Sequence, residues 1–186
     1  MSEKIRSFIA IDTPAPVKLE LSQLLSHLQA RTSLPVKWVK PEQMHLTLVF
    51  MGEVSPSFIQ NAAVILKTAL NNCPRFKCQL QGLGAFPSIS RARVLWTGIE
   101  NGRVKIMELQ QVVVNNLKPL GYVPEKRPFS PHLTIGRLRD FAPVDFVRDV
   151  SFVSSVWEVN QVVLYQSKLY PEGPIYKPLV HFNLTF

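Results

Sequence analysis

His45-Leu46-Thr47-Leu48 and His132-Leu133-Thr134-Ile135 are two stretches of this chain that share one pattern of residues. Side chains alternate between faces along a strand, so each histidine would point the same way as its threonine, and the two aliphatic residues would point the other way. The aliphatic residues would anchor each strand in a core, and the polar pair would be presented at a surface or cleft. Two such strands predict a matched pair of imidazoles, one acting as a base and the other as an acid.

The surroundings of the two stretches repeat at a nearly constant offset. His45 and His132 are 87 residues apart, as are Arg6 and Arg93. In both halves an arginine-led strand, an acidic residue, an amphipathic helix and a loop come before the histidine, an order that indicates an internal duplication. Duplicated halves usually pack about a pseudo-two-fold axis, which would bring the two His–Thr pairs together across a central cleft. We expect one domain over residues 1–186, built of two intimate lobes.

Hydrophobic patterning and capping signals predict the remaining elements. Three helices are expected after Asp12-Thr13-Pro14, Ser55-Pro56 and Asn101-Gly102, and a loop is expected over 84–88. Strands are expected over 5–11, 36–39, 44–51, 76–83, 93–99, 155–163, 163–169 and 180–186.

Composition narrows the class of protein. The chain has 186 residues, is 46% hydrophobic and contains no run of about 18 apolar residues, so we expect no membrane span. Its first residues lack the apolar region of a signal peptide, which favours a cytoplasmic location. Cys73 and Cys78 are the only cysteines, and we expect both to be reduced and structural. Phosphate-binding glycine loops and carboxylate clusters are absent from the sequence, so we expect neither a cofactor nor a metal.

Basic residues gather around both stretches. The formal net charge is +8, which favours a polyanionic partner. Lys37 and Lys40 precede the first stretch; Lys126 and Arg127 precede the second, and Arg137 and Arg139 follow it. A site lined in this way suits a phosphate group.

Two histidines that converge on one phosphate can perform acid–base chemistry. A neutral imidazole can accept a proton from a nucleophile, while an imidazolium donates one to the leaving oxygen. Thr47 and Thr134 can donate hydrogen bonds to the non-bridging oxygens of the phosphate. His27 and His181 lack this pattern, and we interpret them as ordinary structural histidines.

With both motifs in hand, the chain resembles the 2H phosphoesterase superfamily, and within it the RNA 2′,3′-cyclic phosphodiesterases, also called 2′-5′ RNA ligases. The resemblance covers nearly the whole chain. It rests on the stretches Arg6–Ile11, Trp38–Leu48, Gly82–Pro87, Arg93–Ile99, Pro128–Ile135 and Leu164–Leu169. Gly136 stands where the family commonly has alanine and Ala92 where it commonly has proline; neither position belongs to the expected chemistry.

The resemblance implies an α+β fold that is bilobal, with duplicated antiparallel sheets backed by helices and a central cleft between lobes related by a pseudo-two-fold axis. It implies metal-independent opening of a 2′,3′-cyclic phosphate at an RNA end to leave a 2′-phosphate. His45 would be the proton donor, His132 the proton acceptor, and Arg137 would add positive charge at the phosphate. Which imidazole carries the proton follows from the resemblance alone.

Other substrate contacts and functions stay open at this point. Arg127 is a further candidate contact with substrate, and Phe8 and Phe129 are candidates for stacking on a base, with core packing as the alternative. The expected partner is RNA with a 2′,3′-cyclic phosphate terminus, tRNA fragments included, and the expected state is a monomer. The same site would also suit a 2′-5′ RNA ligase or a 2′-5′ oligonucleotide phosphodiesterase. A non-catalytic module that binds RNA ends is the alternative from a different class.

Overall fold

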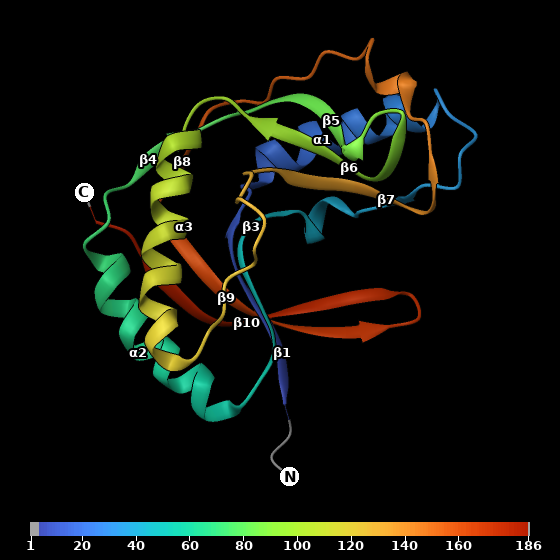
Figure 1. Ribbon diagram of the computed structural model, residues 1–186. Helices are drawn as coiled ribbons and strands as arrows, with labels where there is room; N and C mark the ends of the chain where they lie inside the picture. Colours follow the sequence, from blue (N-terminus) through green and yellow to red (C-terminus); the bar gives the residue numbers. More distant parts are fainter. Residues whose placement is uncertain (1–3, 186) are drawn as a thin grey trace.

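The computed structural model describes residues 4–185 and has an α+β architecture (Figure 1). The strands are β1 (Ile5–Asp12), β2 (Lys37–Trp38), β3 (His45–Val54), β4 (Phe76–Cys78), β5 (Leu80–Ser88), β6 (Arg91–Ile99), β7 (Leu133–Ala142), β8 (Trp157–Val159), β9 (Gln161–Tyr170) and β10 (Gly173–Asn183). The helices are α1 (Ala15–Gln29), α2 (Pro56–Asn71) and α3 (Arg103–Leu117), with single 3-10 turns η1 (Pro41–Gln43), η2 (Lys118–Leu120) and η3 (Asp145–Val147). The sequence-based prediction of an antiparallel α+β fold is confirmed.

The order of the strands displays the duplication. The main sheet runs β10-β9-β1-β3-β7-β6-β5, with β2 added to β7, and all its pairings are antiparallel. β1 lies between β3 and β9, just as β6 lies between β7 and β5, so the order of strands reads alike in both directions from the centre. The two halves are joined at that centre by one residue pair, Leu46 opposite Leu133. Both leucines are buried, at 1% and 0% exposure, so the joint is apolar.

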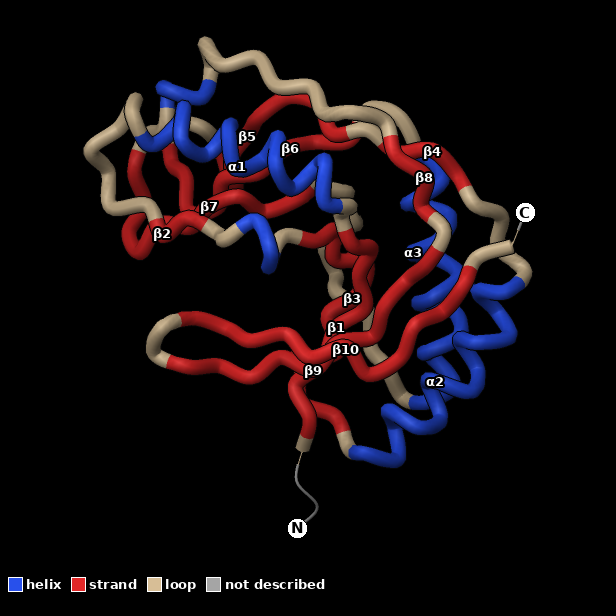
Figure 2. Tube along the Cα trace, turned by 180° about the vertical axis from the view of Figure 1, so that it is seen from behind, coloured by secondary structure: helices blue, strands red, loops and turns tan. Residues whose placement is uncertain are grey.

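The helices exchange between the halves. α1 follows β1 of the first half, yet it lies against β5, β6 and β7 of the second half in both views of the fold (Figures 1 and 2). α3 follows β6 of the second half, yet it packs on β3 and α2. α1 and α3 are equivalent in the duplication, and each has 15 residues. Because each half is covered by a helix that belongs to the other, the two lobes share one hydrophobic core.

Several local predictions differ from the structure. The strands expected over 76–83 and 155–163 are each divided in two, into β4 and β5 and into β8 and β9. The expected loop over 84–88 is wrong, because β5 continues to Ser88 in register with β6. The last strand is β10, which begins at Gly173 rather than at residue 180. Asp12 and Thr13 do not cap α1 with their side chains; the Thr13 hydroxyl instead donates to the Met44 carbonyl at 3.5 Å. The predicted start of α2 is confirmed, since the Ser55 hydroxyl accepts a hydrogen bond from the Phe58 amide at 3.1 Å.

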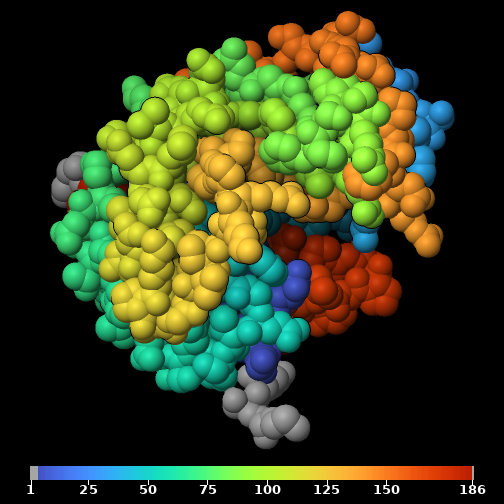
Figure 3. All heavy atoms as spheres, in the orientation of Figure 1, coloured from blue at the N-terminus to red at the C-terminus, as the bar shows by residue number. Residues whose placement is uncertain are grey.

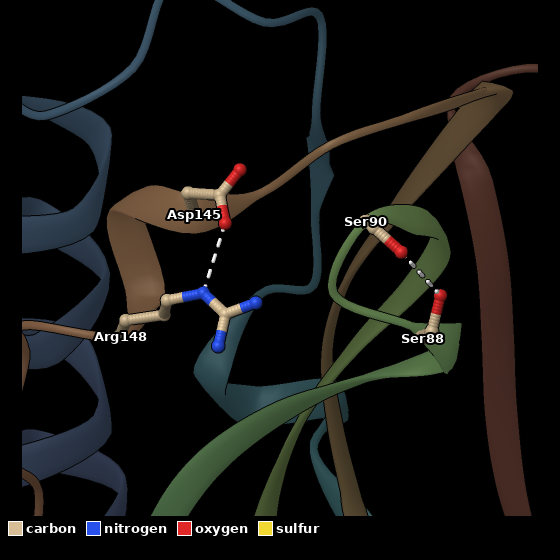
Figure 4. A network of polar contacts seen from close by, with 4 residues as sticks. All are labelled: Ser88, Ser90, Asp145 and Arg148. Carbon is tan, nitrogen blue, oxygen red and sulfur yellow. Dashed lines mark hydrogen bonds and ion pairs between the residues drawn. The ribbon is translucent and has the colours of Figure 1, made fainter.

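The outer end of the second half is held by short polar contacts (Figure 4). The hydroxyls of Ser88 and Ser90 lie 3.1 Å apart across the turn between β5 and β6, and Arg148 donates to Asp145 at 2.9 Å within the η3 turn. The Val144 amide joins these two turns by donating to the Ile89 carbonyl at 2.9 Å. These contacts fix the far ends of β5, β6 and β7 while leaving the centre of the sheet free for the site. No helix in the described part of the chain is long and apolar enough to cross a membrane.

Candidate active site

The two motifs meet at the joint between the halves, and the register of β3 and β7 arranges their side chains. Leu46 lies opposite Leu133, so continuing the antiparallel register by one residue each way sets His45 opposite Thr134 and Thr47 opposite His132. The two leucines point into the core, and the four polar residues therefore occupy the other face. His45 and His132 are then diagonal neighbours, with backbones roughly 7–8 Å apart, and the threonines take the other diagonal.

Each histidine is oriented by the backbone just before it. His45 Nδ1 lies 2.8 Å from the Gln43 carbonyl oxygen, and His132 Nδ1 lies 2.7 Å from the Ser130 carbonyl oxygen. A carbonyl only accepts, so the Nδ1 atom of each ring must carry a hydrogen. In the neutral form, Nε2 of each imidazole is therefore left as a proton acceptor. The two histidines enter the site in the same tautomer and with the same backbone hydrogen bond.

His45 is enclosed by aromatic residues from three other strands. Phe8 stacks on the His45 ring at 4.7 Å between centroids, and Tyr176 meets the same ring edge-on at 5.1 Å. Tyr165 also stacks on Phe8 at 5.2 Å, with its centroid 6.5 Å from that of His45, and it donates a 2.6 Å hydrogen bond to the carboxylate of Asp12. Asp12 is the register partner of His45 on β1. His45 is thus held by rings on one side and faces a carboxylate on the neighbouring strand.

His132 has a smaller aromatic support. Phe86 on β5 meets its ring edge-on at 5.0 Å, and Trp96 on β6 lies 5.2 Å from Phe86. The Trp96 ring fits over Gly84, where an added Cβ would lie 2.3 Å from the nearest indole atom. A glycine at position 84 therefore leaves the space that the Trp96 indole occupies beside Phe86.

β3 and β7 each contain a bulge that changes which residues lie on the site face, the face of the sheet that carries the two histidines and two threonines of the motifs. On β7, Gly136 pairs with Leu95 and Thr134 with Trp96, so Ile135 is an extra residue without a partner on β6. The extra residue reverses the alternation, and Arg137 returns to the face of His132 and Thr134. The burial pattern agrees, since Ile135 and Leu138 are both buried and Arg137 is exposed.

The matching bulge on β3 occurs at the equivalent motif residue, Leu48. Val49 pairs with Ile9 and Thr47 with Ala10, so Leu48 is unpaired on that side. Phe50 therefore takes the place on the first half that Arg137 takes on the second. The duplication is thus broken at this position, with a cation on one side of the site and an aromatic ring on the other.

Burial and charge set the protonation of the histidines. Desolvation is the main cause that lowers the pKa of both His45 and His132 below 6.5, and the charge of Arg137 lowers both further. The backbone hydrogen bonds oppose this by favouring the imidazolium form. The Asp12 carboxylate raises the pKa of His45, and no carboxylate among the described residues contributes to the pKa of His132. The charges around the two rings therefore differ, and the negative one is beside His45.

The structure does not bring every predicted contact to this site. Phe8 is 4% exposed and is covered by other rings of the protein, so it packs in the core and is not free to stack on a base. Phe129 is partly buried and also packs against the core. Arg127 is exposed in the segment before β7. Lys37 lies opposite Arg137 in the pairing of β2 with β7 and is exposed, as are Lys40, Lys126 and Arg139.

Several residues of the site were not predicted from the sequence. Asp12, Tyr165, Tyr176 and Phe86 reach the histidines only through strand pairing between distant parts of the chain. The sequence predicts a helix cap at Asp12, because Asp-Thr-Pro before a helical stripe is a typical capping signal. Its position opposite His45 was indicated only by its place in the repeat, as the acidic residue at the end of the first strand.

Two histidines and two threonines on one face of the joint between the halves, with an arginine on the same face, define a phosphoesterase of the two-histidine class. The chain matches the model of the family described as LigT like Phosphoesterase over residues 11–96 and 99–176, and it belongs to this family. The assignment made from the two motifs is confirmed.

Known proteins of this family match along almost their whole length. An RNA 2′,3′-cyclic phosphodiesterase of Thermotoga maritima is 36% identical over 177 residues, which is 94% of this chain and 93% of that protein. The crystal structure of TT0787 from Thermus thermophilus superposes with a TM-score of 0.82 and 26% identity, covering 97% of this chain and 98% of that one. The crystal structure of Escherichia coli LigT complexed with 3′-AMP gives a TM-score of 0.78 and 26% identity, covering 99% and 100%.

Proposed function

We propose that this protein hydrolyses RNA 2′,3′-cyclic phosphate ends to 2′-phosphates, with His45 and His132 as the acid and the base. The observation that carries the proposal is the diagonal placement of the histidines across the joint. In an in-line displacement, the attacking and leaving oxygens lie on opposite sides of phosphorus. An acid and a base at opposite corners fit that geometry, and two threonines at the other corners fit the non-bridging oxygens.

The reaction balances with these groups. His132 Nε2 removes a proton from water, whose oxygen forms a bond to phosphorus as the bond from phosphorus to the 3′ oxygen breaks. His45 Nε2 gives its proton to the departing 3′ oxygen, and the phosphate stays on the 2′ oxygen. The Asp12 carboxylate supports His45 as the donor, because it favours the charged form of that ring. Arg137 supplies positive charge for the phosphate oxygens.

The relatives support the substrate class. The Thermotoga maritima protein is named for RNA 2′,3′-cyclic phosphodiesterase activity, and Escherichia coli LigT has been crystallised with 3′-AMP, a nucleotide that carries a phosphate on its ribose 3′ oxygen. The cyclic ester of an RNA end presents phosphorus between the 2′ and 3′ oxygens, so one site can hold both kinds of ribose phosphate. We place the protein as a monomer in the cytoplasm, acting on RNA fragments such as those of tRNA.

The test is hydrolysis of an RNA oligonucleotide that ends in a 2′,3′-cyclic phosphate, in the presence of EDTA. Product identification by ³¹P NMR should give the 2′-phosphate. His45→Ala and His132→Ala should each lose about 10²–10⁴-fold in kcat, the usual contribution of a positioned acid or base. His181→Ala is the matched control, because this histidine is exposed and hydrogen-bonded to Gln161 away from the joint.

Three results would separate the alternatives. Joining of RNA ends at a rate above hydrolysis would indicate a ligase, with a 5′-hydroxyl in place of water as the nucleophile. Full hydrolytic activity in the double variant of His45 and His132 would refute the proposed mechanism, and salt-sensitive RNA binding without turnover would indicate a binding module.

A further inference from the structure

Arg6 is a second cation on the site face of the first half. It lies on β1 two residues before Phe8, so both side chains project from the same face of the strand. Its guanidinium carbon lies 4.6 Å from the centroid of the Phe50 ring, a cation–π contact. Burial raises the pKa of Tyr176, and the charges of Arg137 and Arg6 oppose that rise. Arg6 lies six residues before Asp12, the register partner of His45, so it stands farther along the strand from that histidine.

Arg6 lacks an anionic partner within residues 4–185. Glu53 is its register partner on β3, yet no ion pair joins the two side chains. The Arg6 Nε atom is buried and has no hydrogen-bond acceptor among the described residues. Its equivalent in the other half, Arg93, differs: it lies over Phe141 at 5.2 Å and donates to the Arg139 carbonyl. Arg6 is thus a positioned cation whose hydrogen-bonding capacity the protein does not use.

A cavity of about 550 Å³ adjoins the ring on which Arg6 rests. Phe50 lines it together with apolar and aromatic side chains that include Phe58, Leu120, Tyr122 and Val123, and with one carboxylate, that of Glu125. The segment that includes residues 120–125 lies over β3 on its way to β7, as the yellow-to-orange atoms over the teal ones show (Figure 3). The volume of the cavity falls within the range of small-ligand sites, and its mainly apolar wall suits the flat face of a nucleobase.

This region continues the active site along β1 and β3. Phe8 stacks on His45 at 4.7 Å, and Phe50 is the register partner of Phe8 on the neighbouring strand. Phe8 and Asp12, the register partners of Phe50 and His45, are four residues apart on β1, so Phe50 lies about 13 Å from His45 along the strands. That distance suits the next residue of a chain whose terminal phosphate lies between the histidines.

We propose that Arg6 and the Phe50-lined cavity form a subsite for the penultimate nucleotide of an RNA substrate. Arg6 would pair with the phosphodiester that joins this nucleotide to the terminal one, and the cavity would receive its base. The proposal rests on the proposed function for the identity of the substrate. It predicts that the protein distinguishes an RNA chain from a mononucleotide that carries the same cyclic phosphate.

The experiment compares Arg6→Gln with the unmodified protein on two substrates, adenosine 2′,3′-cyclic phosphate and an ApA dinucleotide that ends in a 2′,3′-cyclic phosphate. Loss of a charge-assisted hydrogen bond to phosphate should lower the ratio of kcat/KM for the dinucleotide to that for the mononucleotide by about tenfold. Arg6→Lys keeps the charge and should recover part of the ratio. Arg93→Gln is the matched control and should leave the ratio unchanged.

A binding measurement makes the test independent of turnover. Calorimetry with ApA carrying a terminal 2′-phosphate should give a salt dependence of log Kd that is shallower by about 0.7 in Arg6→Gln, the value for one contact to a single-stranded phosphate. An Arg6→Gln variant with an unchanged substrate ratio and an unchanged salt slope would overturn the subsite. If the unmodified protein hydrolyses neither cyclic substrate, the proposed function is wrong, while the binding result still decides the subsite.

Discussion

Replacing Leu46 by alanine removes one half of the residue pair that joins the two halves of the sheet. Leu46 is 1% exposed and its partner Leu133 is 0% exposed, so the three lost carbon atoms leave a cavity at the joint. Buried leucine-to-alanine changes cost about 3–5 kcal/mol, depending on how far the surroundings collapse. For a chain of this length, each kcal/mol lowers Tm by about 2–4 °C, so we expect a decrease of roughly 10 °C.

Leu46→Ala should also lower the rate of catalysis. Leu46 separates His45 from Thr47, and its side chain sets how closely β3 approaches β7. Collapse or widening of the joint by about 1 Å would move the two histidines relative to each other, and displacements of that size cost about 10²-fold in rate. We therefore expect kcat on a cyclic phosphate substrate to fall by ten- to a hundredfold, at a temperature where the variant is still folded.

The control for this prediction is Leu80→Ala. Leu80 is 0% exposed on β5 and lies opposite Ile99, away from the joint. The Leu80→Ala variant should lose as much free energy of unfolding, measured in urea, as Leu46→Ala does. Its kcat should stay within about twofold of that of the unmodified protein. Equal kcat values in the two variants would refute the idea that the joint sets the distance between the histidines.

Three other outcomes follow from the site. Because burial and Arg137 hold the pKa of His45 and of His132 below the usual 6.5, the fraction of imidazolium that can donate a proton decreases as pH rises above that range. We therefore expect kcat/KM to fall as pH rises through neutrality. The alkaline limb of kcat should lie at higher pH, since bound phosphate favours an imidazolium, and a flat profile between pH 6 and 8 would contradict this. Arg137→Gln should raise the pKa of both histidines in an NMR titration and lower kcat/KM by tenfold or more; a fall in either pKa would count against its placement. Gly84→Ala should cost about 1–3 kcal/mol in urea unfolding, because the new Cβ overlaps the Trp96 ring, and unchanged stability would show that the indole can move.

The centre of the fold was predictable from the sequence because the duplication repeats there. The His-x-Thr strands, the helix before each of them and the Ser55 cap all follow from local patterns. The offset also matches the elements closely, since β3 begins at His45 and β7 at Leu133, one residue after the second histidine. Period-two alternation was enough to place histidine and threonine on one face.

The predictions that failed concern segments whose structure is set by pairing between distant strands. Pro174 and Pro178 argue against a central strand, but β10 is an edge strand, where a missing amide hydrogen is tolerated. Gly84 and Pro87 indicate a loop, yet cross-strand pairing with β6 keeps β5 extended. Strict alternation would also put Arg137 on the core face, since it lies five residues after His132; the bulge at Ile135 is invisible in the sequence.

The exchange of α1 and α3 between the halves bears on how two equivalent histidines become different, one as proton donor and the other as proton acceptor. A chain of one half would lack the helix that the other half supplies and would offer one histidine, so it would need a second copy to complete both. An identical pair of halves presents equal imidazoles, and neither is marked as donor or acceptor. Joined in one chain, the two copies are free to diverge, and here Asp12 stands beside one imidazole while Phe50 and Arg137 occupy equivalent places. The covalent link thereby allows a symmetric scaffold to run an asymmetric reaction.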